Sequence, residues 1–205
     1  MSKHDHLRSL PITERYPEQV WKALNYAAKA HEEQKRKLSG NHFIEHPFGV
    51  LEIVRQVSDD PEIYQAAVLH DTVEDTDCTV DDLCTEFNDR VGFLVWGVTK
   101  DDTVQDKHER DLDYLRRLEY EAEEGSIIIA LADKIHNITD KITGLKSLGT
   151  QMCDKFTSNP AADLWWFTAV LEIGQRRLPD CPLNDRLQAL IAEFDHLNRT
   201  AQHAS

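Results

Sequence analysis

The sequence predicts an all-α protein built as a single domain. Glycine is sparse, at 8 of 205 residues. Apolar residues recur at spacings of three and four, while the apolar–polar alternation typical of β-strands is rare. A chain of 205 residues is long enough for one complete hydrophobic core. We therefore expect a single helical bundle.

Proline residues mark the beginnings of the first helices. Pro17 is typical of a first helical turn and predicts a helix that runs to about Lys37. Pro47 is expected to open the second helix. Pro61, which follows the capping sequence Ser-Asp-Asp, is expected to open the third. That third helix would deliver the dipeptide His70-Asp71.

The rest of the chain shows comparable signals. Thr79 with Asp82 three residues later indicates a capping box, which begins a helix towards Val98 with a break near Asn88. Four further helices are expected, at residues 106–124, from 125 through the apolar run 127–131, at 163–177 and at 184–197. We divide the chain into an N-terminal extension (1–16), a helical core (17–150) and C-terminal helices packed on that core (151–200).

Composition excludes several classes of protein. The formal charge of −14 and the absence of a long basic cluster argue against a nucleic acid partner, but not against a small nucleotide. No apolar stretch approaches the roughly 20 residues needed to span a bilayer, and the N-terminus lacks a signal peptide. The four cysteines form no C-x-x-C pair, so a disulfide framework is not expected. We expect a cytoplasmic protein without a membrane partner, and a homo-oligomer is left open.

Two acidic positions adjoin apolar helical sequence and indicate a metal. His70-Asp71 ends the run Ala-Ala-Val-Leu, and Asp133 follows the core-forming run 127–132. A buried carboxylate is costly without a cation. Lys134 is expected to be a poor partner for Asp133, because adjacent helical residues point about 100° apart. A metal shared by His70, Asp71 and Asp133 is the better partner. The alternative for His70-Asp71 is a helix end with solvated acids.

His46 supplies a fourth candidate ligand. It precedes Pro47 and is expected to be extended or in a turn; alone, it would be interpreted as an exposed loop histidine. Two imidazoles and two carboxylates suit Mn²⁺, Fe²⁺, Zn²⁺, Ni²⁺ or Co²⁺ better than Mg²⁺ or Ca²⁺. Such a metal would lower the pKa of bound water and polarise a phosphoryl oxygen. We therefore predict a metal site inside the helical core.

The same residues, in the same order, resemble the HD superfamily of metal-dependent phosphohydrolases, named for the pair that His70-Asp71 matches. The surrounding motifs resemble the hydrolase domain of the RelA/SpoT family over roughly residues 20 to 145. The motifs are Ala30-His31-x-x-Gln34-x-Arg36-Lys37, Ile44-x-His46-Pro47, Leu69-His70-Asp71-x-x-Glu74-Asp75-Thr76, Gly97-Val98-Thr99-Lys100 and Leu131-Ala132-Asp133-Lys134-x-His136-Asn137. The length is similar to that of the small stand-alone alarmone hydrolases of this family.

This resemblance implies a function and a set of roles. The family domain removes the 3′-pyrophosphate from ppGpp and pppGpp with Mn²⁺. The metal ligands would be His46, His70, Asp71 and Asp133, with Glu74 and Asp75 activating and orienting the attacking water. Substrate contacts are assigned to Arg36, Lys37, Lys134, Asn137 and Asp140. Asn137 and Asp140 continue the helical face of Asp133, where a substrate at the metal would lie.

Several alternatives stay open. The cations of Lys35-Arg36-Lys37 would equally well complement a helix C-terminus. The family's Asn-x-Arg-Thr reads Asn137-Ile138-Thr139-Asp140 here, and the Asp140 carboxylate could repel a phosphate. A phosphatase for another nucleotide (a dNTP, a mononucleotide or NADPH) is therefore an alternative, and a catalytically weak nucleotide-sensing module is a third. His31 is expected to be structural, and Trp165-Trp166-Phe167 to lie in the core or at an interface, or to stack on a base.

Overall fold

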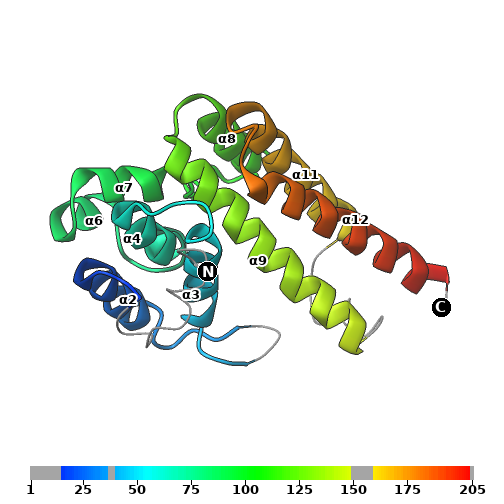
Figure 1. The fold of residues 1–205 in the computed structure, drawn as a ribbon, viewed down its shortest axis with the longest axis horizontal. Helices are drawn as coiled ribbons and strands as arrows, with labels where there is room; N and C mark the ends of the chain where they lie inside the picture. The colour runs from blue at the N-terminus through cyan, green and yellow to red at the C-terminus, as the bar shows by residue number, and fades with distance from the viewer. Residues whose placement is uncertain (1–14, 37–39, 149–158, 204–205) are drawn as a thin grey trace, which may run out of the picture.

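The chain folds into helices, as the sequence predicts. The computed structural model describes residues 15–36, 40–148 and 159–203, and in these ranges the only β-type pairing is an isolated antiparallel bridge between Lys35 and His42 (Figure 1). The helices are α2 (Glu18–Ala30), α3 (Glu45–Val54), α4 (Pro61–Leu69), α5 (Thr72–Asp75), α6 (Val80–Glu86), α7 (Asp89–Trp96), α8 (Lys107–Tyr120), α9 (Glu124–Leu148), α11 (Pro160–Arg177) and α12 (Pro182–His203).

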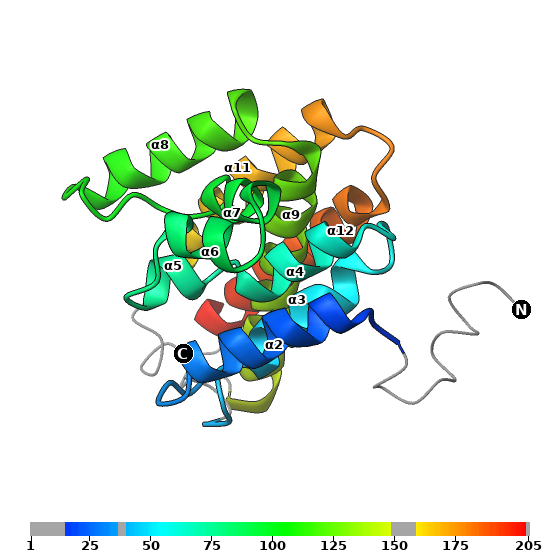
Figure 2. The same cartoon turned by 90° about the vertical axis from the view of Figure 1, so that its left-hand side faces the viewer.

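The long helix α9 is the central element of the bundle. It contacts α3, α4 and α7 from the first half of the chain, and α11 and α12 from the second half. Figures 1 and 2 show α9 running between these two groups, with α8 near its N-terminal end and α11 alongside it. The predicted apolar run lies where expected, since Ile127, Ile129 and Leu131 are fully buried. This burial places Asp133, one turn further on, at the edge of the core.

Local capping signals were predicted well. Asp60 caps α4 by accepting a hydrogen bond from the backbone N–H of Glu62 at 2.9 Å. Thr79 and Asp82 form the complete capping box that begins α6. Asn88 caps α7, which explains the predicted break. Each cap satisfies a backbone N–H that has no partner within its own helix, so these signals act locally.

The predicted end of the first helix is wrong. Helix α2 ends at Ala30 rather than near Lys37. The chain then turns back on itself: Arg36 N–H donates to the Asn41 carbonyl at 2.9 Å, and Phe43 N–H donates to the Gln34 carbonyl at 3.1 Å. Gly40 provides the positive φ of 72° within this turn. Lys35 and Arg36 therefore do not cap a helix C-terminus, and this alternative for the basic cluster is excluded for them.

The predicted conformation of His46 is also wrong. Helix α3 begins at Glu45, so His46 and Pro47 both lie in its first turn. Proline is tolerated there because the first backbone N–H groups of a helix need no intrahelical partner. The preference of a pre-proline residue for extended backbone is therefore overridden, and His46 is held on a regular helix.

The packed chain includes residues from each predicted segment. Tyr16 is buried and makes edge contacts with the rings of Phe48 and Tyr64. The predicted boundary at residue 150 falls outside the described residues, so this division stays a prediction.

Among the described residues, no helix combines the length and the apolar composition needed to cross a membrane.

Candidate metal centre and active site

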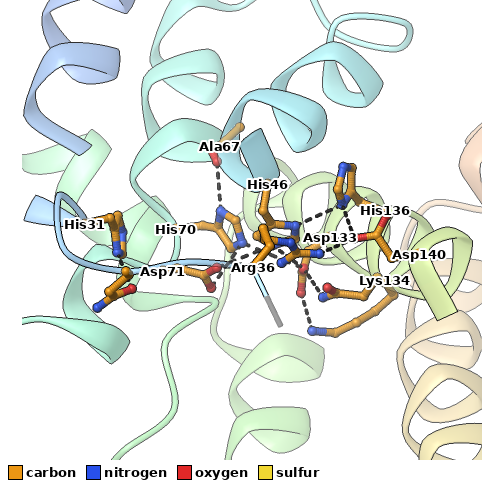
Figure 3. Close-up of polar contacts among 12 residues, drawn as sticks. His31, Arg36, His46, Ala67, His70, Asp71, Asp133, Lys134, His136 and Asp140 are labelled. Atoms are coloured by element: carbon orange, nitrogen blue, oxygen red, sulfur yellow. Dashed lines mark hydrogen bonds and ion pairs between the residues drawn. The ribbon is translucent and has the colours of Figure 1, made fainter. Parts of the chain in front are cut away.

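Three segments bring His46, His70, Asp71 and Asp133 together (Figure 3). His46 lies in the first turn of α3, His70 and Asp71 form the turn between α4 and α5, and Asp133 lies on α9. His46 Nε2 is 3.3 Å from Asp71 Oδ2 and 3.1 Å from Asp133 Oδ1. His70 Nε2 is 3.1 Å from Asp71 Oδ1 and 3.7 Å from Asp133 Oδ1.

Hydrogen bonds on the outer side of each imidazole orient it towards this cluster. His70 Nδ1 donates to the Ala67 carbonyl at 2.9 Å, which leaves Nε2 as the inward-facing atom. His70 Nε2 is fully buried and has no aligned hydrogen-bond partner among the described residues. One ligand atom each of His46, His70 and Asp71 lies within 4.8 Å of the others. A buried nitrogen with a free lone pair, facing carboxylates at this spacing, is suited to a metal.

The charges in the cluster are strongly coupled. Burial lowers the pKa of His46 and of His70, but the nearby carboxylates of Asp71 and Asp133 outweigh this effect and raise both pKa values. Burial raises the pKa of Asp71, and the charges and hydrogen bonds of the two histidines overcome that effect and lower it. The histidines and the carboxylates thus stabilise each other's charged forms, and one divalent cation can supply the same positive charge.

Glu74 and Asp75 lie just past the cluster and differ in exposure. Glu74 is half-buried, and its Oε2 accepts a hydrogen bond from the backbone N–H of Lys100 at 3.2 Å. Burial, followed by the charge of Asp71, raises the pKa of Glu74. Asp75 is exposed, and its backbone carbonyl accepts a hydrogen bond from Gln34 Nε2 at 2.8 Å. Burial and then the charge of Asp71 raise the pKa of Asp75 as well. Glu74 is the less exposed of the two, so its carboxyl is the better placed to exchange a proton beside Asp71.

Two neighbours on α9 hold the Asp133 carboxylate. Asn137 Nδ2 donates to Asp133 Oδ1 at 2.5 Å, and the Lys134 ammonium pairs with Asp133 Oδ2. The prediction that Lys134 is a poor partner is wrong. Its Cβ does point away around the helix, but its long flexible stem bends back to the neighbouring side chain. Burial lowers the pKa of Lys134, and the charge of Asp133 more than reverses this and raises it.

Arg36 and Asp140 form an ion pair on the other side of His46 (Figure 3). The guanidinium also lies 5.9 Å from the centre of the Phe43 ring. The Asp140 carboxylate is thus compensated by a cation of this chain, and its repulsion of a phosphate is weaker than its sequence position suggests. Lys37, the other basic residue assigned to substrate, lies outside the described residues.

His136 is a member of the site that sequence reasoning did not assign. Its Nδ1 lies 3.0 Å from His46 Nδ1, and its ring packs where Gly49 has no side chain. Burial, and then the charge of His46, lower the pKa of His136 to about 4, so this ring is neutral and able to accept a hydrogen bond. The sequence signal that could have found His136 is its position three residues after Asp133 on the same helix.

His31 was expected to be structural. It is buried at the C-terminus of α2 and forms a hydrogen bond with Gln34 Oε1 at 2.9 Å.

A pocket of about 140 Å³ opens beside the cluster. Its walls come from the α4–α5 turn, the loop after α7, α8 and α9. They consist of His70, Asp71, Glu74, Val98, Lys100, Tyr114, Ile129, Ala130, Asp133, Lys134 and Asn137. The predicted site residues Glu74, Lys134 and Asn137 thus share one cavity with three of the predicted ligands. Arg36, Asp75 and Asp140 do not line it.

Comparison with known proteins agrees with this geometry. The sequence profile of the HD domain matches residues 23–147, which contain all four clustered residues. The chain belongs to the HD domain family. The match lies within the predicted core segment.

The curated relatives of this HD domain protein are of two sizes. The human guanosine-3′,5′-bis(diphosphate) 3′-pyrophosphohydrolase MESH1 is 40% identical over 129 residues, covering 60% of this chain and 69% of the human protein. The Aquifex aeolicus protein named guanosine-3′,5′-bis(diphosphate) 3′-pyrophosphohydrolase is 36% identical over 124 residues. A GTP pyrophosphokinase of Streptomyces antibioticus is 38% identical over 122 residues. The aligned part spans only 18% and 14% of these two bacterial proteins.

Solved structures share the fold of this HD domain protein. A metazoan SpoT orthologue, described as hydrolysing ppGpp, aligns with a TM-score of 0.69 and 26% identity over 87% of this chain and 97% of its own. A Listeria monocytogenes protein aligns with a TM-score of 0.66 and 24% identity, and it supports the fold alone. The similarity to the metazoan structure extends well beyond residues 23–147, because it covers most of both chains.

Membership of the HD domain family, together with the His/Asp cluster, implies a divalent metal ion. The residues present fit such an ion. The buried Nε2 of His70 lacks a hydrogen-bond partner among the described residues, and the coupled carboxylates require positive charge. Two imidazole nitrogens with carboxylate oxygens are a donor set that suits first-row transition metals.

Replacing His136 by phenylalanine is expected to weaken metal binding by about 10- to 100-fold. Phenylalanine keeps the ring but cannot accept a hydrogen bond from His46 Nδ1, so His46 loses the contact that turns Nε2 towards the cluster. Metal affinity can be measured by competition with a chromogenic chelator. His108→Phe, in the exposed first turn of α8, is the control and should bind metal normally. Unchanged affinity in His136→Phe would show that His136 does not orient His46.

Proposed function

We propose that this protein is a metal-dependent hydrolase that removes the 3′-pyrophosphate from the guanosine alarmones ppGpp and pppGpp. The observation that carries the proposal is the convergence of His46, His70, Asp71 and Asp133 beside a pocket that also holds Glu74 and two lysines. The activity named for the human and Aquifex relatives supports the choice of substrate.

The metal ligands in this proposal are His46, His70, Asp71 and Asp133, and the metal is Mn²⁺. Two nitrogen and two oxygen ligands disfavour Mg²⁺ and Ca²⁺, which prefer all-oxygen sites. A six-coordinate ion would leave two positions for water and substrate. Lys134 and Asn137 support the site from outside by holding the Asp133 carboxylate. The support fixes the orientation of a ligand that would otherwise rotate freely.

The protein side chains then divide the chemistry of hydrolysis among them. The bound metal supplies Lewis-acid chemistry by lowering the pKa of water and polarising a phosphoryl oxygen. Glu74 accepts the proton of the attacking water, whose oxygen forms a bond to the phosphorus at the ribose 3′-oxygen. The bond between that phosphorus and the 3′-oxygen breaks, and a proton returns to the oxygen. The products are a nucleotide with a free 3′-hydroxyl and inorganic pyrophosphate.

The remaining predicted residues serve substrate binding in this proposal. Asn137 lines the pocket on the face of α9 that carries Asp133, within reach of the ribose or its 3′-phosphate. Arg36 and Lys37 would lie against the guanine or the other phosphates. Asp75 would orient the water together with Glu74, although it is the more exposed of the two.

A second candidate function is hydrolysis of another nucleotide, such as a dNTP, a mononucleotide or NADPH. The Arg36–Asp140 ion pair favours it, because the pair neutralises a cation that a highly charged alarmone would otherwise use. A nucleotide sensor has less support, since a sensor has no need for Glu74 beside the metal.

One set of assays separates these functions. The purified chain, loaded with Mn²⁺, is offered ppGpp, dNTPs, nucleoside monophosphates and NADPH in parallel, and released phosphate and pyrophosphate are measured. Release of pyrophosphate from ppGpp is the expected result. Turnover of another nucleotide with ppGpp left intact would refute the alarmone assignment, and binding without any turnover would favour the sensor.

Replacing Asp140 by asparagine is expected to lower the KM for ppGpp by roughly fivefold, which is about 1 kcal/mol. The change releases the Arg36 guanidinium from its partner, and the substrate phosphates gain its charge. Steady-state kinetics measure the effect. Asp195→Asn breaks a comparable pair with Arg199 on α12 and should leave KM unchanged. A KM that stays constant or rises in Asp140→Asn would remove Arg36 from the substrate contacts.

A further inference from the structure

Part of the pocket wall, here called the inner end, takes no part in the proton transfers of the proposed hydrolytic step. This end is formed by Lys100 from the loop after α7, Tyr114 on α8 and Lys134 on α9. The whole pocket is small, at about 140 Å³. This volume is of the right order for one or two phosphate groups.

Trp166 on α11 gathers both lysines at this inner end. Lys100 Nζ lies 4.2 Å from the centre of the Trp166 ring, and Lys134 Nζ lies 5.3 Å from it. Tyr114 packs on the same tryptophan, with ring centres 5.1 Å apart. Aromatic faces attract ammonium groups, most strongly where water is excluded. Two like charges are thus held over one ring, an arrangement that an anion between them would stabilise.

The carboxylates that accompany the two lysines leave them available to an anion. Asp111 pairs with Lys100 Nζ at 2.7 Å but does not line the pocket, so it does not occupy the space in front of the ammonium group. Asp133 pairs with Lys134, and a metal ligated by Asp133 would draw on the same negative charge. The two ammonium groups lie in the same pocket as Glu74, next to the place where the phosphorus–oxygen bond breaks in the proposed reaction.

We propose that this inner end is the binding site for the diphosphate leaving group, with Lys100 and Lys134 contacting its oxygens and Trp166 positioning both ammonium groups. The inference rests on the proposed function and adds the place where inorganic pyrophosphate is held. It also gives the C-terminal part of the chain a role, because Trp166 lies outside the HD domain match at residues 23–147. Sequence reasoning assigned this tryptophan to core, interface or base stacking, and none of these roles includes the lysines.

The test is binding of inorganic pyrophosphate to the full chain. The protein is loaded with one equivalent of Mn²⁺, freed of unbound metal and titrated calorimetrically with pyrophosphate and, separately, with phosphate. Metal content is measured after each titration, because pyrophosphate also chelates Mn²⁺. Lys100→Gln is expected to weaken pyrophosphate binding about tenfold or more, since a charge-assisted hydrogen bond is lost. Lys100→Arg should restore most of it.

Lys107→Gln is the matched control. Lys107 Nζ lies 3.7 Å from the same Asp111 carboxylate, but Lys107 is exposed and outside the pocket, so its loss should leave pyrophosphate binding unchanged. Trp166→Leu should weaken binding several-fold with the metal retained, whereas Trp166→Phe, which keeps an aromatic face, should bind nearly as the wild type does. If the two Trp166 variants unfold at equal temperatures, the weaker binding of Trp166→Leu results from misplaced lysines and not from a loss of packing.

The outcomes distinguish this inference from the proposed function. Wild-type affinity for pyrophosphate in both Lys100→Gln and Trp166→Leu, with metal in place, would overturn the inference even if ppGpp is hydrolysed. The expected losses of affinity in a protein that leaves ppGpp intact would keep the diphosphate site and reject the alarmone substrate. Binding of phosphate alone, with pyrophosphate excluded, would also overturn the inference, because the pocket would then be too small for the leaving group.

Discussion

Replacing Asp71 by alanine is expected to remove the metal and to reduce hydrolysis of ppGpp by at least about a thousandfold, or roughly 4 kcal/mol. Asp71 lies close to both inward-facing histidine nitrogens, 3.1 Å from His70 Nε2 and 3.3 Å from His46 Nε2. Without Asp71, three candidate ligands remain and the cluster loses one negative charge. Metal content is measured by atomic absorption and the rate by release of pyrophosphate.

Asp77→Ala provides the control for Asp71→Ala. Asp77 is an exposed acid a few residues further along the same segment, so its loss should affect neither metal content nor rate. If Asp71→Ala retained one equivalent of metal at wild-type affinity, the assignment of Asp71 as a ligand would be wrong. Loss of metal together with loss of the folded state would be recognised from the far-UV circular dichroism.

Replacing Glu74 by glutamine is expected to spare the metal and reduce the rate by about 10²- to 10⁴-fold, the usual contribution of a general base. The glutamine amide oxygen can still accept the hydrogen bond from the Lys100 backbone, so the local structure should persist. The amide cannot take a proton from the attacking water. The rate and the metal content are measured on the same preparation, and the expected signature is a lower kcat with full metal occupancy.

Asp75→Asn shows how the work is divided within the acidic pair. Asp75 is exposed and does not line the pocket, so its loss should reduce the rate far less than the loss of Glu74. An equal loss in both variants would mean that the pair acts jointly, as the family resemblance implies. A wild-type rate in Glu74→Gln would exclude Glu74 as the proton acceptor.

Helix positions could be predicted because the signals that set them are local. The capping residues Asp60, Thr79 and Asn88 bond backbone groups two or three residues away, so the sequence contains both partners. The end of the first helix could not be predicted. Helix α2 stops at Ala30 because residues 34–36 pair with residues 41–43, and this pairing depends on how the loop returns rather than on the helical propensity of the sequence.

The candidate site divides in the same way between sequence and structure. The cost of burying charge singled out His70, Asp71 and Asp133, because a carboxylate at the end of an apolar helical run needs a cation wherever the helix packs. The burial of these residues follows from the periodic pattern of apolar residues along each helix. His46 depended on resemblance to the HD family, and the structure places it on α3 beside the other three.

Only the tertiary structure decided which partners the charged side chains around the cluster contact. Arg36 and Asp140 are separated by 104 positions, and no local pattern links them. Lys134 bends back to Asp133. Lys100 and Lys134 both lie over the Trp166 ring, and these three residues come from three different segments of the chain. Long, flexible cations find partners that packing brings near, so their roles cannot be predicted from helix periodicity. The sequence by itself therefore determined an all-α HD domain protein and three residues of its candidate metal cluster, whereas the fold decided which cations face the pocket beside it.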